Sequence, residues 1–553
     1  MTRIPLRPPE QVMTLSRLGS LHQCRLSFMR QLLRRMKQEN WSFTRPHFDI
    51  NTSGEGFAVY TSQGPTRAYS LIAFAHDLPD DMRSDRVIAT AWDATFALFD
   101  GTPNLADIER LRANVPLQEA GRVSETELSI SRANRSARLW NATVETLAKG
   151  QQPDADVLAN VGYLMRTTAV YGSGKFGAAD RASLEERPEF SPPFQVEMLS
   201  VYLIRAFVAD LVEHMAKVRS PNSAVPLAPG LRRGLGIGNS TGLGMAPFLL
   251  NHPRLLNNWI SARERALATI RSLASADSTA HAFLSTYLHA KQSIGLWHSE
   301  HPLQKAKLKQ LAADIQMLDA RLESFDFTQP QAWNALYLWA ENTLSEEGQE
   351  LLVSLMLEPH ADLVDSLGPQ MQADESTLFM IDGAMPAETL SALICTHYDW
   401  ALQIDWTAPQ AIARLWYVSE EKLEPRLCER ANEPLEDYEQ PLAPARDICR
   451  MFGDLHTFAG NTAAFLQAHP EHRSAARRVQ MRALFPYSEV CDNTIDAKML
   501  PIDMLRAKLS FFGATNFDPR SDRWVRINMF RGAPYPSELS QQNSDDWVYG
   551  VVK

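Results

Sequence analysis

Apolar residues recur every three or four positions along most of this chain, from about residue 85 onward. One such segment carries Leu199, Leu203 and Phe207. Spacing of this kind places apolar side chains along one side of an α-helix. Clusters of proline and glycine interrupt the pattern at 150–155, 187–194, 221–247, 327–331 and 431–444, and we expect connections or domain edges there. The pattern therefore predicts a mainly α fold with a large multi-helix body.

Two parts of the chain read as β structure instead. Residues 57–60 and 67–74 are apolar and aromatic, and they flank a turn at Gly64-Pro65. They predict a small N-terminal β-hairpin or sheet. Residues 523–530, Arg-Trp-Val-Arg-Ile-Asn-Met-Phe, predict a strand in a C-terminal β element.

The chain has 553 residues, of which 45% are hydrophobic, and domains hold roughly 150 residues each, so we expect several packing units. The predicted units are a basic N-terminal helix (1–40), a small α+β region (41–150), a helical core with two glycine-rich loops (151–330) and a helical C-terminal region ending in a short β element (331–553).

The charge distribution is uneven. The whole chain carries −10, but residues 1–40 carry +6. The overall acidity argues against a surface that attracts phosphate backbones, so no nucleic-acid partner is favoured. The predicted basic N-terminal helix is amphipathic, so we expect its apolar side to dock on the protein core. The alternative is that the helix contacts an acidic partner, RNA or a membrane surface.

The cysteines and the N-terminus indicate the compartment. The five cysteines are widely spaced without a C-x-x-C motif, which predicts neither disulfides nor a thiolate zinc site. The start lacks the apolar region of a secretory signal, and no run reaches the roughly 18 apolar residues of a membrane span. We therefore expect a cytoplasmic protein without a membrane span, with an organellar presequence as the alternative.

The most unusual local feature is a glycine cluster. Six glycines fall within the fifteen positions 230–244, where 26 glycines in 553 residues predict about 0.7. Glycine lets a ligand approach backbone N–H groups, and hydroxyls assist in holding an anion. The cluster is therefore a candidate anion-binding loop, and the alternative is a tight crossover between packed helices. The predicted substrate-binding residues here are Gly236, Gly238, Ser240, Thr241 and Gly242.

Two known phosphate-binding motifs do not fit this cluster. Its spacing is G-x-G-x-x-x-G-x-G after a predicted helix that ends near Arg219, so it lacks the spacing and the preceding strand of the dinucleotide fingerprint. It also lacks the Gly-Lys-Ser/Thr of a Walker A motif.

A second glycine-bearing segment, 166–177, follows a stretch predicted to be helical from Val157 to Met165. It carries Arg166, Tyr171 and Lys175. Arginine binds carboxylates through two parallel hydrogen bonds, while tyrosine or lysine can move a proton once its pKa is shifted. We predict that Arg166 binds substrate and that Tyr171 or Lys175 is catalytic. The alternative is an ordinary helix end at Gly172 or Gly174.

Histidines provide further candidates. His281, His289, His298 and His301 cluster in sequence without an H-E-x-x-H motif, so no metal site is predicted. His397 and Asp399 lie two residues apart, as do Asp454 and His456. Positions i and i+2 of a helix point apart, so proximity in sequence does not establish a pair; His397 is kept as the third candidate for proton transfer.

Charged segments near the C-terminus bear on assembly. Residues 419–439 are rich in acids, and Arg473, Arg477, Arg478 and Arg482 follow. Most simply both are solvated helix faces. Complementarity between them would favour a homo-oligomer.

Taken together, these residues predict a cytoplasmic enzyme acting on a small anionic metabolite of carboxylate, phosphate or thioester type. Metal-independent proton abstraction or elimination, as in a lyase, suits the candidate groups. No cofactor is favoured; a flavin- or nucleotide-dependent oxidoreductase is one alternative, with the glycine cluster around a pyrophosphate. A helical interaction protein without chemistry is the other.

Overall fold

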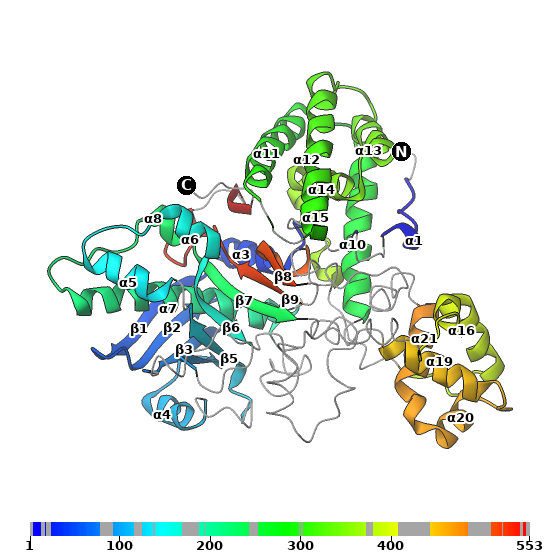
Figure 1. Ribbon diagram of the computed structural model, residues 1–553, viewed down its shortest axis with the longest axis horizontal. Coiled ribbons are helices and arrows are strands. Elements are labelled where there is room, and N and C mark those ends of the chain that lie inside the picture. The colour runs from blue at the N-terminus through cyan, green and yellow to red at the C-terminus, as the bar shows by residue number, and fades with distance from the viewer. Residues whose placement is uncertain are drawn as a thin grey trace.

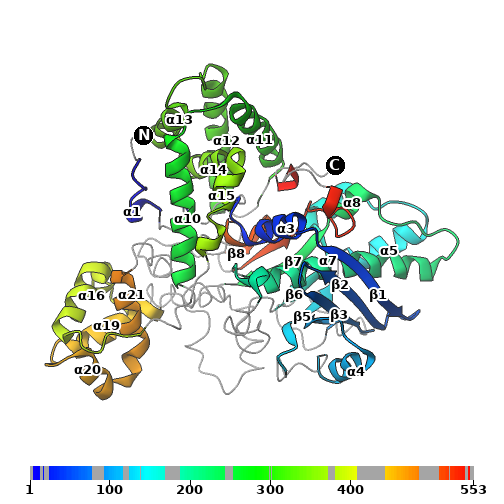
Figure 2. The same ribbon diagram turned by 180° about the vertical axis from the view of Figure 1, so that it is seen from behind.

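The computed structural model of the protein describes residues 4–12, 17, 24–77, 92–115, 124–136, 139–168, 187–192, 194–242, 253–297, 299, 302–371, 380–407, 443–484, 510–521, 524–541 and 546–548. The described part contains a nine-stranded sheet with helices on both faces, and two groups of helices beside it (Figures 1 and 2).

The sheet draws its strands from most of the chain, in the spatial order β1-β2-β3-β4-β5-β6-β7-β9-β8. Its strands are β1 (Ser42–Ile50), β2 (Gly56–Gln63), β3 (Ala68–Ala75), β4 (Ala94–Asp100), β5 (Glu127–Arg135), β6 (Tyr163–Thr168), β7 (Gly236–Gly242), β8 (Thr515–Ser521) and β9 (Trp524–Met529). The neighbours from β1 to β6 pair antiparallel, β6 and β7 pair parallel, and β9 pairs antiparallel with both β7 and β8.

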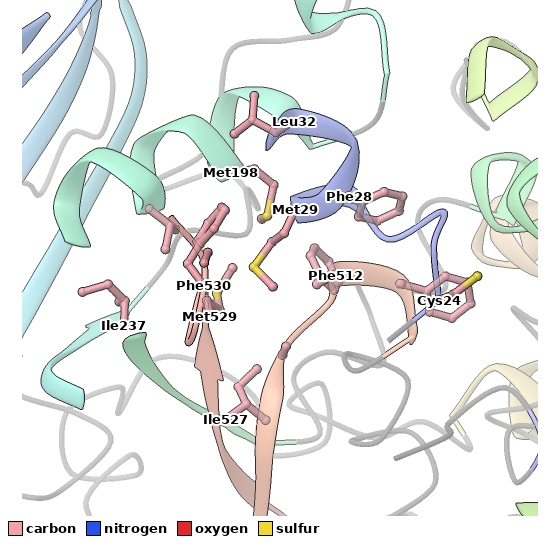
Figure 3. Packing of buried hydrophobic residues seen from close by; sticks show 14 of the residues in the cluster. Cys24, Phe28, Met29, Leu32, Met198, Ile237, Phe512, Ile527, Met529 and Phe530 are labelled. Atoms are coloured by element: carbon pink, nitrogen blue, oxygen red, sulfur yellow. The ribbon is translucent and has the colours of Figure 1, made fainter. Parts of the chain in front are cut away.

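One face of the sheet is covered by one long buried helix and one shorter helix. These are α7 (Gln195–Arg219), which contacts β2 through β7, and α3 (Phe28–Gln38), which packs against α7. Figure 3 shows Ile237 of β7 and Ile527 and Met529 of β9 on this side, with Met29 of α3 and Met198 of α7. Burial of these apolar side chains joins the C-terminal strands to the N-terminal helix.

The opposite face has its own smaller core near β2 to β5. There Ile108 and Leu111 of α4 (Leu105–Asn114) pack on Ile72, Ala97 and Ile130. Strands buried on both faces read as continuous apolar runs, and β3 has the sequence AYSLIAFA.

The remaining helices fall into three sets. Around the sheet lie α5 (Trp140–Ala148), α6 (Ala155–Val161) and α8 (Pro229–Arg233). A second set comprises α10 (Pro253–Ser272), α11 (Asp277–Gly295), α12 (Pro302–Glu323), α13 (Ala332–Thr343), α14 (Glu346–Leu357) and α15 (Ala361–Asp365), drawn in green in Figure 1, with the short α1 (Pro9–Val12) beside them. A third, smaller set comprises α16 (Ala387–Leu402), α19 (Ala443–Leu455), α20 (Thr462–Ala468), the single turn η8 (Pro470–His472) and α21 (Arg473–Leu484).

The basic N-terminal region docks on the second helical set through ion pairs. Arg7 binds Glu264 of α10 and Glu350 of α14, each at 2.7 Å. Arg30 of α3 binds Glu358 at 2.6 Å. The expected single helix over 1–40 is absent from the described residues, where α1 and α3 are separate helices. Arg7 and Arg30 therefore form ion pairs inside the molecule.

A buried arginine ties α7 to two distant loops. Arg205 donates hydrogen bonds to the carbonyl oxygens of Leu235, Arg233 and Ala533 at 2.7–3.0 Å. Its guanidinium lies over the ring of Tyr535, 4.0 Å from the ring centroid. Because these carbonyls belong to the segments before β7 and after β9, Arg205 holds the two strands in place over α7.

The mainly α prediction is wrong, because the protein is a mixed α/β structure with a large sheet. The hairpin expected at 57–74 is only β2 and β3 of that sheet, and the C-terminal strand β9 pairs within it. The sequence patterns did not predict the other six strands, β1, β4, β5, β6, β7 and β8. Residues 94–100 were assigned to a helical pattern, 163–165 to the end of a helix and 236–242 to a loop, but they form β4, β6 and β7.

Among the residues that the structure describes, no helix combines the length and the apolar character that a membrane span requires.

The sheet takes strands from three of the predicted units, 41–150, 151–330 and 331–553, and so connects them.

Candidate functional site

The register of the central strands aligns polar residues on one face of the sheet. Asn134 of β5 lies opposite Arg166 of β6, Arg166 lies opposite Gly238 of β7, and Gly238 lies opposite Asn528 of β9. Directly paired residues share a face of the sheet. The intervening residues, such as Ile237, point to the apolar face that α3 and α7 cover (Figure 3). The row from Asn134 to Asn528 therefore lies on the opposite face.

A second row runs beside the first. Thr95 of β4 lies opposite Arg132 of β5, and Arg132 lies opposite Thr168 of β6. Arg132 and Arg166 are thus diagonal neighbours, whose Cα atoms stand roughly 7–8 Å apart in such a pair. Two guanidinium groups consequently occupy one face of two adjacent strands.

The groups around Arg132 are aromatic and polar. Its guanidinium lies over the ring of Trp92, 4.7 Å from the centroid. The hydroxyl of Thr95 is 3.1 Å from Nε2 of His76, the residue that follows β3. We call the set His76, Thr95, Arg132, Asn134 and Arg166 the cationic face.

Burial shapes the electrostatics of this face. Arg166 is 7% exposed and Thr95 is fully buried. Burial lowers the pKa of Arg132 to about 10. Burial also lowers the pKa of His76, although the nearby Asp93 acts in the opposite direction. The site therefore holds desolvated cations beside an imidazole that favours its neutral form.

The start of β4 and the end of β5 are locked together next to these groups. The Asn134 side-chain oxygen accepts a hydrogen bond from the Asp93 backbone N–H at 2.9 Å, and the Asp93 carboxylate accepts one from the Arg135 backbone N–H at 2.8 Å. Asp93 is fully buried. These two hydrogen bonds hold the start of β4 against the end of β5, next to Thr95 and Arg132.

The glycine cluster is partly a strand. Residues 236–242 pair with β6 on one side and with β9 on the other. A Cβ atom on Gly238 would lie 2.5 Å from Cγ of Tyr163, and one on Gly236 would lie 2.5 Å from the Met529 carbonyl oxygen. Both glycines therefore pack closely against neighbouring strands and not at a crossover between helices, and their role in binding an anion stays a prediction.

The predicted binding residues have different outcomes. Ser240, Thr241 and Gly242 lie on β7 with Gly236 and Gly238, and their anion-binding role stays a prediction. Arg166, the first residue of the segment 166–177, lies beside Gly238 of the glycine cluster.

Of the three predicted catalytic residues, the structure describes only His397. Tyr171 and Lys175 lie outside the described residues. His397 is on α16, in the third helical set, and Figures 1 and 2 both show α16 apart from β6. Burial lowers its pKa, and Arg482 of α21 adds to the effect.

The structure also describes part of the histidine cluster and of the charged segments that the sequence singled out. His281 and His289 both lie exposed on α11, whereas His298, His301 and the acidic stretch 419–439 are outside the described residues. Asp454 pairs with His472 instead of His456. Arg482 lies over the Tyr398 ring within the third helical set, 5.6 Å from the centroid.

Sequence reasoning missed His76, Thr95 and Arg132. The available signal was an arginine two residues after Ile130 in a strand-like segment, at a position that shares the face of this apolar residue. A charge in the interior of a sheet is costly unless it is paired or used.

The family models, the curated proteins and the solved structures that were compared with this chain contain no match to it.

Proposed function

We propose that the protein binds a small anionic metabolite of carboxylate, phosphate or thioester type at the cationic face, and acts on it as an enzyme that moves a proton. One observation carries this proposal: Arg132 and Arg166 lie on one face of neighbouring strands whose other face is apolar core. Arginine is suited to this role because its planar fork of donors matches carboxylate and phosphate oxygens.

The burial of Arg166 and the half-burial of Arg132 support a binding role. A desolvated guanidinium interacts more strongly with an anion than one in water, since the local dielectric is low. The ring of Trp92 beneath Arg132 restrains that side chain, so less conformational entropy is lost on binding.

His76 is the proposed proton-transfer group. A neutral imidazole accepts a proton, and the lowered pKa keeps His76 neutral near pH 7. Its Nε2 is hydrogen-bonded to the Thr95 hydroxyl, so Thr95 orients the ring. His76 thereby takes the role for which His397 was proposed from sequence.

The test is calorimetric titration of the full chain with inorganic phosphate, citrate and acetyl coenzyme A. Arg132→Met and Arg166→Met should weaken the best of these probes by roughly 1.5–3 kcal/mol each, about tenfold to a hundredfold, as for loss of a charged hydrogen bond. Arg112→Met is the matched control, because Arg112 lies on α4 over the Phe57 ring, outside the cationic face.

Folding must be separated from binding, since Arg166 is buried. Arg166→Lys keeps the charge and the stem but loses the fork, and should weaken binding while the circular dichroism spectrum stays unchanged. Binding of no probe, or equal affinity of Arg132→Met, Arg166→Lys and Arg112→Met for each probe, would refute the proposal.

A further inference from the structure

Two histidines and two carboxylates converge in the third helical set, away from the cationic face. They are Asp454 near the end of α19, His469 between α20 and η8, and Glu471 and His472 in η8. One potential ligand atom from each of the four lies within 4.8 Å of each of the others. Nitrogen and oxygen donors from different parts of the fold thus face a common point.

The local geometry aims the two imidazoles. Nε2 of His472 lies 2.7 Å from Oδ2 of Asp454, and Nδ1 of His469 lies 3.5 Å from Oε1 of Glu471. The rings of both histidines stack on Phe465 of α20, at 5.0 Å for His469 and 5.8 Å for His472. Their orientations are therefore held by packing against one aromatic ring.

The turn η8 makes this convergence possible. Pro470 begins η8, and the backbone N–H of His472 donates to the His469 carbonyl at 3.2 Å. In a 3₁₀ turn, residues three apart lie on the same side. The sequence His469-Pro-Glu-His472 consequently presents both imidazoles toward Asp454.

We propose that Asp454, His469, Glu471 and His472 bind one Zn²⁺ ion. Imidazole nitrogen and carboxylate oxygen are established zinc ligands, with bonds of about 2.0–2.2 Å, which places tetrahedral ligand atoms about 3.3–3.6 Å apart. The separations between 2.7 and 4.8 Å need only small side-chain rotations to reach that arrangement. Four protein ligands complete a tetrahedral sphere, as in structural zinc sites.

Such an ion would fasten the end of α19 to the turn between α20 and α21. The group is formed by side chains at the surface, where Asp454 and Glu471 are exposed and only His472 is buried. A bound metal ion adds most to the stability of a small packing unit that has little core of its own. The alternative is that Asp454 and His472 form a simple ion pair without a metal.

The experiment uses the untagged full chain, treated with chelator and then titrated with Co²⁺ as a spectroscopic substitute for Zn²⁺. We expect one ion per chain, with the visible absorption of tetrahedral cobalt, displaced by Zn²⁺. Zinc should also raise the midpoint of thermal unfolding, because it binds only the folded arrangement.

Variants assign the ligands. His469→Ala, Asp454→Asn and Glu471→Gln should each lower the affinity at least about tenfold, the smaller effect known for changes around zinc sites. His456→Ala is the matched control: His456 follows α19 and stacks on Phe452, outside the group. Absence of stoichiometric binding, or equal affinity of His469→Ala and His456→Ala, would overturn the proposal. Arg132→Met should leave zinc binding unchanged, so this result is independent of the anion site.

Discussion

Arg166 of β6 lies directly opposite Gly238 of β7, in the parallel pair of strands within the described sheet. Because the strands are parallel, β6 ends at Thr168 and β7 ends at Gly242 on the same edge. In open sheets of helices and strands, ligands bind outside the carboxyl ends of such strands. The pairing therefore brings together two segments that are far apart in sequence.

Gly238 is expected to be required for packing. In Gly238→Ala the new Cβ would lie 2.5 Å from Cγ of Tyr163, so the free energy of unfolding should fall by about 1–3 kcal/mol, as for an overpacked core. Urea denaturation measures it. The control is Gly295→Ala at the end of α11, where the added Cβ meets nothing within 4 Å. Equal stability of the two variants would show that the sheet adapts at Gly238.

Arg205 is expected to be essential for stability. Arg205→Met removes the donor of three backbone carbonyls, and leaving buried acceptors unpaired costs about 1–3 kcal/mol for each group. We expect a loss of at least about 2 kcal/mol in denaturant unfolding. Arg265→Met, which loses an exposed bond to Gln370, should change stability by less than about 0.5 kcal/mol. A small effect of Arg205→Met would mean that water satisfies the carbonyls.

The buried ion cluster should make stability depend on acid. Burial acts to raise the pKa of Glu350, but Arg7, Arg263 and Arg17 outweigh it and hold that pKa well below the ordinary value. The stabilisation is present above the unfolded pKa of about 4.3 and is lost as pH falls through and below it. The urea midpoint should therefore drop between about pH 5 and pH 3, where the unfolded chain takes up the proton first.

Substitution tests the same cluster. Glu350→Gln leaves Arg7 and Arg17 with a weaker buried partner and should cost about 3–5 kcal/mol. It should also flatten the acid dependence. The control is Glu346→Gln: the exposed Glu346 carboxylate lies 3.7 Å from the Arg17 guanidinium, and this variant should change neither the free energy of unfolding nor its acid dependence. An unchanged pH profile in Glu350→Gln would place the acid sensitivity elsewhere.

His76 should titrate below the ordinary histidine value of about 6.5, because burial opposes its protonation. A lowered pKa means that the unfolded chain binds the proton first, so this residue's contribution to stability is lost as pH falls below about 6.5. Histidine NMR titration, with His76→Asn to assign the signal, measures the pKa. Titration at or above 6.5 would contradict the burial of the neutral ring.

Much of the local structure was predictable from sequence. The hairpin between 57 and 74, the helix that contains Leu199 to Met215 and the strand near Ile527 correspond to β2–β3, α7 and β9. Each has a strong local period or turn signal. The candidate site was less accessible: Arg166 was identified, while Arg132 and His76 gained importance only from their neighbours.

The sequence by itself determined elements with a strong local signal, such as α7 and the β2–β3 hairpin, because these preferences act between residues close along the chain. Only the tertiary structure decided that residues 94–100, 163–168 and 236–242 are strands of one sheet. A strand is stabilised by hydrogen bonds to partners distant in sequence, and β7 with three glycines depends on β6 and β9 for them. The same long-range pairing placed Arg132 and Arg166 on one face, an arrangement that no local pattern encodes.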